Sequence, residues 1–380
     1  MSNNSLYVAT LKSTFEHLPD SWGLSGLADF HYSPTMKDLY MEDFPQLWAD
    51  IPMRERLCTI GANDYANKWN DVEFVSIEET NLAYLLEKVD PKLAAGAVLD
   101  GKTVGIPLAG GNHQLLFYNK DMVAEQPGSF EVLLDTARKL KKDFNMEYPI
   151  VIPTAACYFI LPMLYGYGSP LWSESLAPGS GIEKESLFET LTLLKQLIYE
   201  EKIMPVKWEQ VESRQAFQEG KAAFCIGGDW DISEHLSVLG NKLGISEIPR
   251  LKRECLSTGN GNYLFLSKYL TPEVYENAAR ACEIILGNEV QQEIVTKLHR
   301  FPAIIDTEMN KSDMGEIDRI NAAVFSKAII LPPLKEVSHM YHVLADLLEP
   351  EVLIKSSIQE LTEDAMKKMK DIDTFIEIKK

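Results

Sequence analysis

Hydrophobic and polar positions along the chain follow two alternating periods, which predict strands interleaved with helices. Short apolar runs predict strands, and apolar residues at three- and four-residue spacing predict the helices between them. The expected strands lie within 72–76, 99–110, 114–119, 148–153, 222–228 and 263–267, and the expected helices within 77–89, 130–142, 186–203, 272–287 and 352–372. This alternation is typical of an α/β protein with mostly parallel sheets.

Length and charge limit the classes of function. A chain of 380 residues is long enough for two domains. Its 37 basic and 56 acidic residues give a net charge of −19. This charge opposes binding to nucleic acid, which needs basic residues to neutralise phosphate, and it also opposes attachment to anionic lipid. The chain contains no apolar run near the ~20 residues of a membrane span.

Two features bear on the cellular compartment. Residues 1–20 lack the basic segment and following apolar segment of a signal peptide. The five cysteines are an odd number, and four of them, Cys58, Cys157, Cys225 and Cys282, have apolar neighbours. We expect them to be buried, free thiols, which favours a reducing compartment. The expected location is cytoplasmic if Met1 is the native start, and otherwise extracellular as a lipoprotein.

The sequence lacks the common signatures of catalysis. It contains no GxSxG, GxxxxGK[ST] or HExxH motif, and Gly259 to Asn262 lack the third glycine of a dinucleotide-binding loop. The histidines are scattered, and His339 and His342 have no third histidine or carboxylate pair beside them. The sequence therefore predicts a non-enzymatic protein without a metal or other cofactor.

Two predicted strands are followed by loops with unusual residues. The segment GGNH ends at His113 and the segment GGDW ends at Trp230. In open α/β sheets, ligands bind outside the carboxyl ends of strands. Asp229 and Asp231 flank Trp230, and because unpaired carboxylates are expensive to bury, we expect this segment to be partly exposed. The alternative is that Trp230 is a core residue.

Four segments, in order, resemble the family 1 extracellular solute-binding proteins, the family of maltose-binding protein. The segments are DGKTVGIPL with FYNKDM (100–108 and 117–122), AFQEGKAAFCIGGDWDIS (216–233), GNYLFLSK with a following helix and RFPA (261–303), and the C-terminal amphipathic helix. The second is the most specific. The first hundred residues match less well, because residues 5–18 lack the family's usual opening strand and helix.

The resemblance implies a fold with two α/β lobes that close around a solute by hinge motion, known as the periplasmic-binding-protein fold. The family's crossover segments fall near Gly110, Gly259 and Asp313. The expected N-terminal lobe therefore comprises residues 1–110 and 260–310, and the expected C-terminal lobe comprises residues 111–259 and 311–380. The ligand is expected in the cleft between the lobes.

Ten residues are candidates for ligand binding. By resemblance, Trp230 stacks on a sugar ring, Tyr158 and Tyr341 match aromatic residues of the cleft, and Asn112 and His113 match an interlobe contact. The carboxylate of Asp229 is expected to accept sugar hydroxyl protons. The remaining candidates come from strand-end loops and are His31, Tyr32, Asn260 and Arg300.

The resemblance implies a protein that captures a sugar or oligosaccharide, with the permease subunits of an ABC importer as partners. Two alternatives stay open. One is a cytoplasmic ligand sensor that reuses the fold, which the missing signal peptide and the thiols favour. The other is an enzyme acting on a small sugar or phosphorylated ligand. The sequence does not identify the solute, because specificity depends on side-chain placement to about an ångström.

Overall fold

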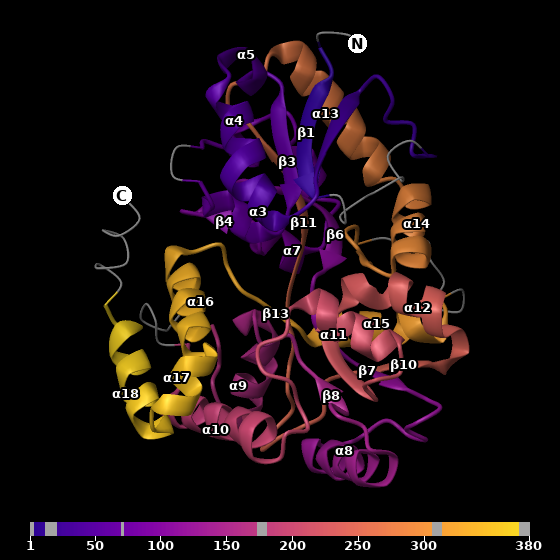
Figure 1. The fold of residues 1–380 in the computed structure, drawn as a ribbon. Coiled ribbons are helices and arrows are strands. Elements are labelled where there is room, and N and C mark those ends of the chain that lie inside the picture. The colour runs from indigo at the N-terminus through magenta and orange to yellow at the C-terminus, as the bar shows by residue number, and fades with distance from the viewer. Residues whose placement is uncertain (1–3, 12–20, 70–71, 173–180, 306–313, 372–380) are drawn as a thin grey trace. The chain divides into compact units, whose positions relative to one another are not determined.

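A computed structural model describes residues 4–11, 21–69, 72–172, 181–305 and 314–371 (Figure 1). The chain divides into two compact units. Unit 1 comprises Met1–Asn112, Asn260–Met314 and Pro332–Leu334, and unit 2 comprises His113–Gly259, Gly315–Leu331 and Lys335–Lys380. The sequence places the first two crossovers near Gly110 and Gly259, and the third, near Asp313, lies outside the described residues.

Unit 1 is built on a sheet with strand order β12-β6-β11-β3-β1-β2. The strands are β1 (Leu6–Leu11), β2 (Ala28–Ser33), β3 (Leu57–Gly61), β6 (Ile106–Gly111), β11 (Thr258–Leu266) and β12 (Phe301–Pro302). β1 pairs in parallel with β2 and β3, whereas β11 is antiparallel to β3 and β6. The chain therefore does open with a strand, β1, although its sequence lacks the family's usual pattern.

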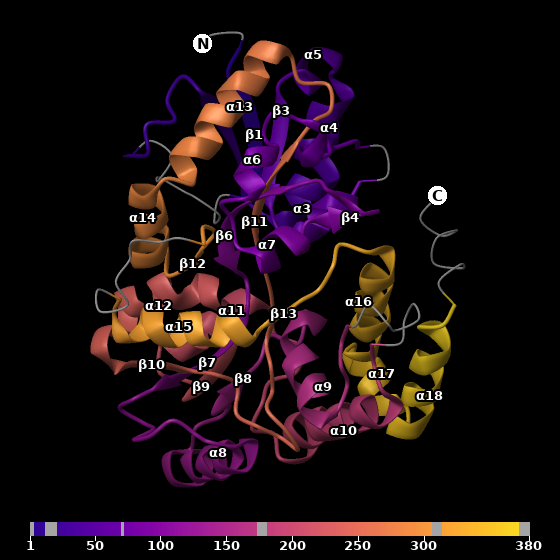
Figure 2. The same cartoon turned by 180° about the vertical axis from the view of Figure 1, so that it is seen from behind.

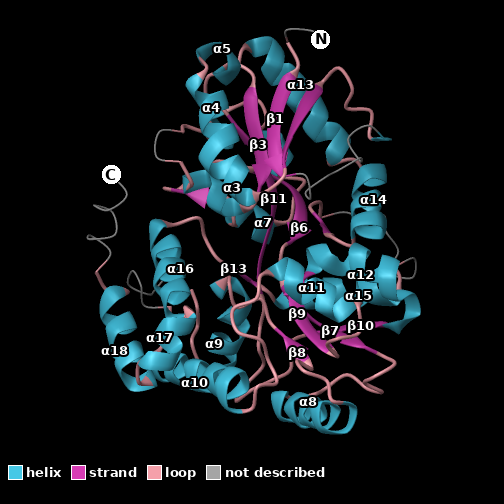
Figure 3. Cartoon of the chain, viewed as in Figure 1, coloured by secondary structure: helices cyan, strands magenta, loops and turns pink. Residues whose placement is uncertain are grey.

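Helices cover both faces of this sheet (Figure 3). They include α3 (Met36–Asp38), α4 (Phe44–Ala49), α5 (Ile51–Arg54), α7 (Pro91–Ala95), α13 (Pro272–Ile285) and α14 (Asn288–Leu298). The core beside α4 is aromatic, and Phe44, Trp48, Tyr65 and Phe265 are buried in it. Gly287 directly follows Leu286, the C-cap residue of α13, and is the N-cap residue of α14.

The strand and helix predicted over 72–89 do not form. Phe74 makes a single bridge to Ser267, and the helix is replaced by two short pieces, η3 (Ile77–Glu79) and α6 (Ala83–Leu86). Thr80 lies between these pieces. Its hydroxyl donates to the Ile77 carbonyl and accepts from the Leu82 amide, so a local side-chain turn competes successfully with the helix.

Unit 2 contains a smaller sheet with strand order β10-β7-β9-β8 (Figure 2). The strands are β7 (Gln114–Asn119), β8 (Ile150–Val151), β9 (Phe224–Gly228) and β10 (Leu243–Ser246). β8 is parallel to β9, while β7 is antiparallel to both β9 and β10. Both principal sheets are thus mixed, and the expectation of mostly parallel sheets is wrong in this detail.

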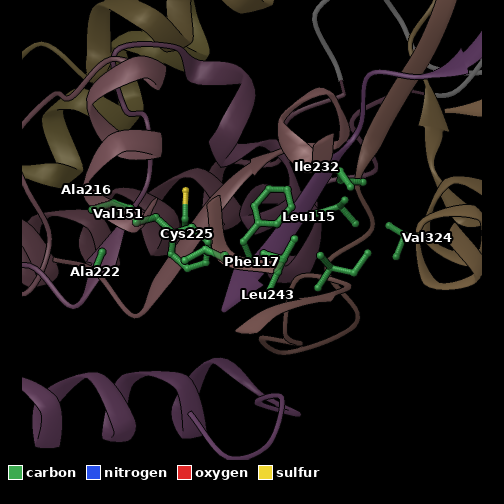
Figure 4. Packing of buried hydrophobic residues seen from close by; sticks show 12 residues of the cluster. Leu115, Phe117, Val151, Ala216, Ala222, Cys225, Ile232, Leu243 and Val324 are labelled. Atoms are coloured by element: carbon green, nitrogen blue, oxygen red, sulfur yellow. The ribbon is translucent and has the colours of Figure 1, made fainter. Parts of the chain in front are cut away.

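The core of unit 2 packs along β7 and β9. Leu115, Phe117 and Cys225 are buried there with residues from the surrounding helices (Figure 4). The helices of this unit are α8 (Phe130–Phe144), α9 (Leu161–Tyr167), α10 (Lys184–Lys195), α11 (Gln210–Gln218), α12 (Ile232–Leu239), α15 (Glu316–Lys327) and α16 (Lys335–Leu347). Ser129 caps α8 by accepting from the Val132 amide.

The expected C-terminal helix is interrupted. It consists of α17 (Pro350–Lys355) and α18 (Ile358–Lys368), and the Ser357 side chain caps the second helix. The buried side of α18 includes Leu361 and Ala365, whereas Ile354 of α17 is exposed. In the parts of the chain that the structure describes, no helix combines the length and apolar character needed to cross a membrane.

Candidate ligand-binding site

Unit 2 carries a group of three aromatic residues at the carboxyl end of β9. Trp230 lies in a short 3₁₀ turn, Asp229–Asp231, that directly follows β9, and it is half-buried. Its ring centroid is 6.2 Å from that of Tyr158 and 6.2 Å from that of Phe159. Tyr158 is also half-buried, whereas Phe159 is buried. Partly exposed aromatic rings of this kind can pack against the apolar face of a ligand.

The two carboxylates beside Trp230 are buried, contrary to the expectation of a partly exposed acidic segment. Asp229 is 0% exposed and Asp231 is 1% exposed. Asp231 is paired, since its carboxylate lies 3.0 Å from Arg214 Nη1 and accepts from Gln210 Nε2 at 3.0 Å. Burial raises the pKa of Asp231, against the opposing effects of these two partners. The burial argument from sequence failed because it assumed an unpaired carboxylate.

Asp229 and His113 form a second buried pair. Asp229 Oδ2 lies 3.6 Å from His113 Nδ1, and the Asp229 amide donates to the His113 carbonyl. The His113 ring is also fully buried and packs against Phe325. Both residues therefore support the turn that carries Trp230, and neither side chain is exposed for a ligand to contact in this structure.

Tyr341 lies on α16 and is half-buried. Its backbone carbonyl accepts a hydrogen bond from Cys157 Sγ at 3.3 Å. Cys157 precedes Tyr158, so this contact places the Tyr341 backbone beside the segment that carries the aromatic group. The structure thus brings three predicted aromatic residues, Trp230, Tyr158 and Tyr341, into one region of unit 2.

Unit 1 brings three other predicted residues together in a polar cluster at the end of β6. Arg300 Nη1 donates to Asn112 Oδ1 at 3.0 Å, and Asn112 Nδ2 donates to Asn260 Oδ1 at 2.7 Å. Asn112 Nδ2 also lies 3.2 Å from the Gly261 carbonyl. Asn112 has a φ of 48°, a left-handed conformation that asparagine tolerates better than most residues. At the carboxyl end of the strand, the amides of Asn112 and Asn260 are partly exposed, whereas Arg300 is buried.

His31 and Tyr32 do not join this cluster. They are neighbours on β2, so their side chains point to opposite faces of the sheet. His31 Nε2 lies 3.3 Å from Asp43 Oδ2, and its ring stacks on Tyr7. Tyr32 stacks on Phe30. The two residues therefore cannot contribute side by side to one site.

The sequence interpretation missed three residues of interest. Gln114 is buried at the start of β7 and contacts the Tyr158 backbone. Asp64 and Lys68 lie just beyond the carboxyl end of β3, 4.0 Å apart, and both side chains are more than a third exposed. Because ligands bind outside the carboxyl ends of strands in open α/β sheets, the position of Asp64 after β3 could have marked it as a candidate. No pattern distinguishes Gln114, since it opens an apolar run.

The described residues contain no group of three or more histidine, cysteine, aspartate or glutamate side chains that could hold a metal ion. The candidate groups in each unit are instead aromatic rings, amides and a guanidinium. Such groups bind uncharged polar ligands through stacking and hydrogen bonds.

Comparison with known families matches residues 45–312 to the family described as "Bacterial extracellular solute-binding protein". Because the match covers more than half of the chain, the protein belongs to this family, as the sequence motifs indicate. Members of the family bind solutes without converting them.

The names of two curated relatives refer to the binding or transport of oligosaccharides. A "Maltooligosaccharide ABC transporter solute-binding lipoprotein" of Streptococcus pneumoniae is 24% identical over 257 residues, which cover 63% of this chain and 58% of the relative. A "Maltotriose-binding protein" of Pyrococcus abyssi is 24% identical over 196 residues, covering 51% of this chain and 42% of that protein. The matches therefore span about half of each relative's length.

Solved structures resemble this one over nearly its whole length. The GacH receptor of Streptomyces glaucescens has a TM-score of 0.81 at 18% identity, with 97% of this chain and 99% of that chain covered. The maltose/maltodextrin-binding domain of Bdellovibrio bacteriovorus, solved with maltotriose, has a TM-score of 0.76 at 18% identity, with coverage of 96% and 98%. These likenesses confirm the predicted two-lobe α/β fold.

Proposed function

We propose that this protein binds a maltooligosaccharide without chemical turnover and serves as the substrate receptor of an ABC importer. The observation that carries the proposal is the partly exposed pair of rings, Tyr158 and Trp230, beside the carboxyl end of β9. The family supports binding without catalysis. The names of the relatives supply the class of ligand and the importer.

The side chains suit the chemistry of a sugar. A pyranose ring has an apolar face of C–H groups and a rim of hydroxyl groups. Aromatic rings pack against the face, and planar amide or guanidinium groups exchange hydrogen bonds with the rim. Within unit 2, Trp230 and Tyr158 supply the first kind of group.

A thermal-shift screen followed by calorimetric titration tests the proposal. The panel is glucose, maltose, maltotriose and maltotetraose, with cellobiose and lactose as controls of different linkage. A ligand that binds only the folded state stabilises it by about 2.7 kcal/mol when the free ligand concentration is a hundred times the Kd. We expect stabilisation by the α-linked oligosaccharides and recovery of the bound sugar unchanged. No shift with any of these sugars, or conversion of the sugar to a product, would reject the proposal.

Hinge closure stays a prediction that small-angle scattering can test. The radius of gyration should decrease when saturating maltotriose is added. Calorimetry on the same sample establishes that the site is filled. An unchanged radius with a filled site would argue against closure, while leaving the binding function intact.

A further inference from the structure

Gln114 is a fully buried polar residue at the start of an otherwise apolar strand. Its side-chain amide is completely engaged. Nε2 donates to the Tyr158 carbonyl at 2.8 Å and to Thr258 Oγ1 at 2.9 Å, while Oε1 accepts from the Thr258 amide at 2.9 Å. The Gln114 carbonyl accepts from Ser257 Oγ at 2.6 Å. These bonds join β7, the beginning of β11 and the segment that carries Tyr158.

Tyr158 is held at both ends by the same pair of residues. Gln114 binds its backbone carbonyl, and its own hydroxyl donates to the Thr258 carbonyl at 3.1 Å. The backbone and the far end of the ring are therefore both tied to the junction between β7 and the start of β11. This junction determines where the Tyr158 ring lies relative to Trp230, whose ring centroid is 6.2 Å away.

A leucine or methionine at position 114 could fill the same buried space. It would leave the Tyr158 carbonyl and the Thr258 amide without their partner, which is the costly way to change a buried hydrogen bond. The amide at position 114 is thus explained by what it holds in place rather than by packing alone.

We propose that Gln114 is a positioning residue for ligand binding, which fixes the Tyr158 ring in register with Trp230. This inference rests on the proposed function, because it assumes that the two rings contact the ligand. It adds a specific role for Tyr158. The single hydroxyl proton of Tyr158 is donated to Thr258, so the residue meets a sugar with its ring face.

A double-mutant cycle distinguishes positioning from general stabilisation. The variants are Gln114→Met, Tyr158→Ala and the two combined, titrated with maltotriose by calorimetry. We expect Gln114→Met to raise the Kd by about tenfold when Tyr158 is present and by less than about twofold in the Tyr158→Ala background, since residues that act together are not additive. Equal effects in both backgrounds would overturn the inference while leaving the binding function standing.

Unit 1 offers a matched control in Gln291, another fully buried amide. Gln291 Nε2 donates to the carbonyls of Leu108 and Ile285, and its Oε1 accepts from the Ala303 amide. Gln291→Met loses the same kinds of hydrogen bond, so it should lower the melting temperature about as much as Gln114→Met does. The Kd for maltotriose should change by no more than about twofold, and by the same factor whether or not Tyr158 is present. A Tyr158-dependent loss of affinity in Gln291→Met would contradict the positioning role.

A measurement without ligand separates this inference from the proposed function. Protein labelled with 5-fluorotryptophan gives a fluorine NMR signal for Trp230. The signal is assigned as the one that is lost in Trp230→Phe. Gln114→Met should shift this signal, and Gln291→Met should not. If Gln114→Met fails to fold, Gln114→Asn takes its place, because it keeps an uncharged amide on a side chain one methylene shorter, which cannot reach both Tyr158 and Thr258. An unmoved Trp230 signal overturns the inference whether or not maltotriose binds, and absence of maltotriose binding to the wild type rejects the proposed function.

Discussion

The indole ring of Trp230 lies against the Cα atom of Gly228, so closely that a Cβ atom at position 228 would come within 2.2 Å of two ring carbons. Gly228 has φ −104° and ψ 158°, an extended conformation that any residue adopts. Glycine is therefore required here by the close approach of the indole and not by the backbone angles. The strand end and the ring fit together because position 228 has no side chain.

Replacing Gly228 with alanine should displace the indole and weaken maltotriose binding by about tenfold, a loss of about 1.4 kcal/mol. The extended backbone accepts alanine without strain, so any fall in the melting temperature should come from displacing the indole and not from the backbone. Calorimetric titration and thermal unfolding measure the two effects. Gly128→Ala is the matched control, since a Cβ atom there meets nothing within 4 Å. Unchanged affinity in Gly228→Ala would show that the position of the indole is unimportant for binding.

Truncation of Trp230 itself separates a binding role from a core role. Trp230→Ala should weaken maltotriose binding by roughly 1–3 kcal/mol, because the ligand loses the large apolar surface that the ring offers. The free energy of unfolding without ligand should fall by less than the ~3–5 kcal/mol of a core Trp→Ala change, since the ring is only half-buried. Calorimetry and urea unfolding measure both quantities.

Trp208 provides the comparison for that experiment. It packs edge-on against Tyr148 and borders the core of unit 2. Trp208→Ala should lower stability and leave the Kd for maltotriose unchanged. If Trp230→Ala behaves like Trp208→Ala, Trp230 is a core residue and the proposed site is wrong.

The strands and helices with clear periodicity were predictable from the sequence, and the site was predictable only in part. The buried run 222–228 and its following Trp230 were located correctly because an apolar strand followed by glycines is a local pattern. The predicted strand includes both glycines, as β9 does. Why glycine stands at position 228 depends on the ring of Trp230 two residues away, which local propensity does not describe.

Most differences between the predicted and the observed surroundings of the candidate residues come from interactions between segments that are distant in the sequence. Asp231 is buried because Arg214 and Gln210, on a separate helix, reach its carboxylate. Asn112 lies 2.7 Å from Asn260, although 148 residues separate them in the chain. Gln114 acquires its partners from two other segments in the same way. A sequence pattern reports the types of residues present, and only the fold brings these polar groups together.

The thiols should be free and slow to react. All five cysteines are unpaired and buried. Burial raises the pKa of Cys157, Cys255 and Cys282 to about 12, so almost none of these thiols is ionised near pH 7. Titration with a thiol reagent should find few reactive groups in the folded protein and five in urea without reductant. A native disulfide would contradict the burial of free thiols and would favour an oxidising compartment.

His235 should make the protein less stable as the pH falls. Its ring is fully buried between Phe117 and Phe217, with centroids at 4.5 Å and 5.0 Å. Burial, with a smaller contribution from the positive charge of Arg214, lowers the pKa of His235 to about 3. The unfolded chain binds a proton at this residue below about pH 6.5, whereas the folded protein does not until near pH 3. Stability from His235 is therefore present above pH 6.5 and decreases by about 1.4 kcal/mol for each pH unit below it.

The variant His235→Phe isolates this contribution, because phenylalanine fills the apolar space and cannot take up a proton. Urea unfolding at pH 7, 6 and 5 measures the free energy of both proteins. The wild type should lose about 2 kcal/mol more than the variant between pH 7 and pH 5, since only its unfolded state gains a proton at position 235. Acidic residues protonate equally in both proteins, so their effect cancels in the difference. Parallel stability curves for the two proteins would show that His235 is protonated in the folded state, which its apolar surroundings argue against.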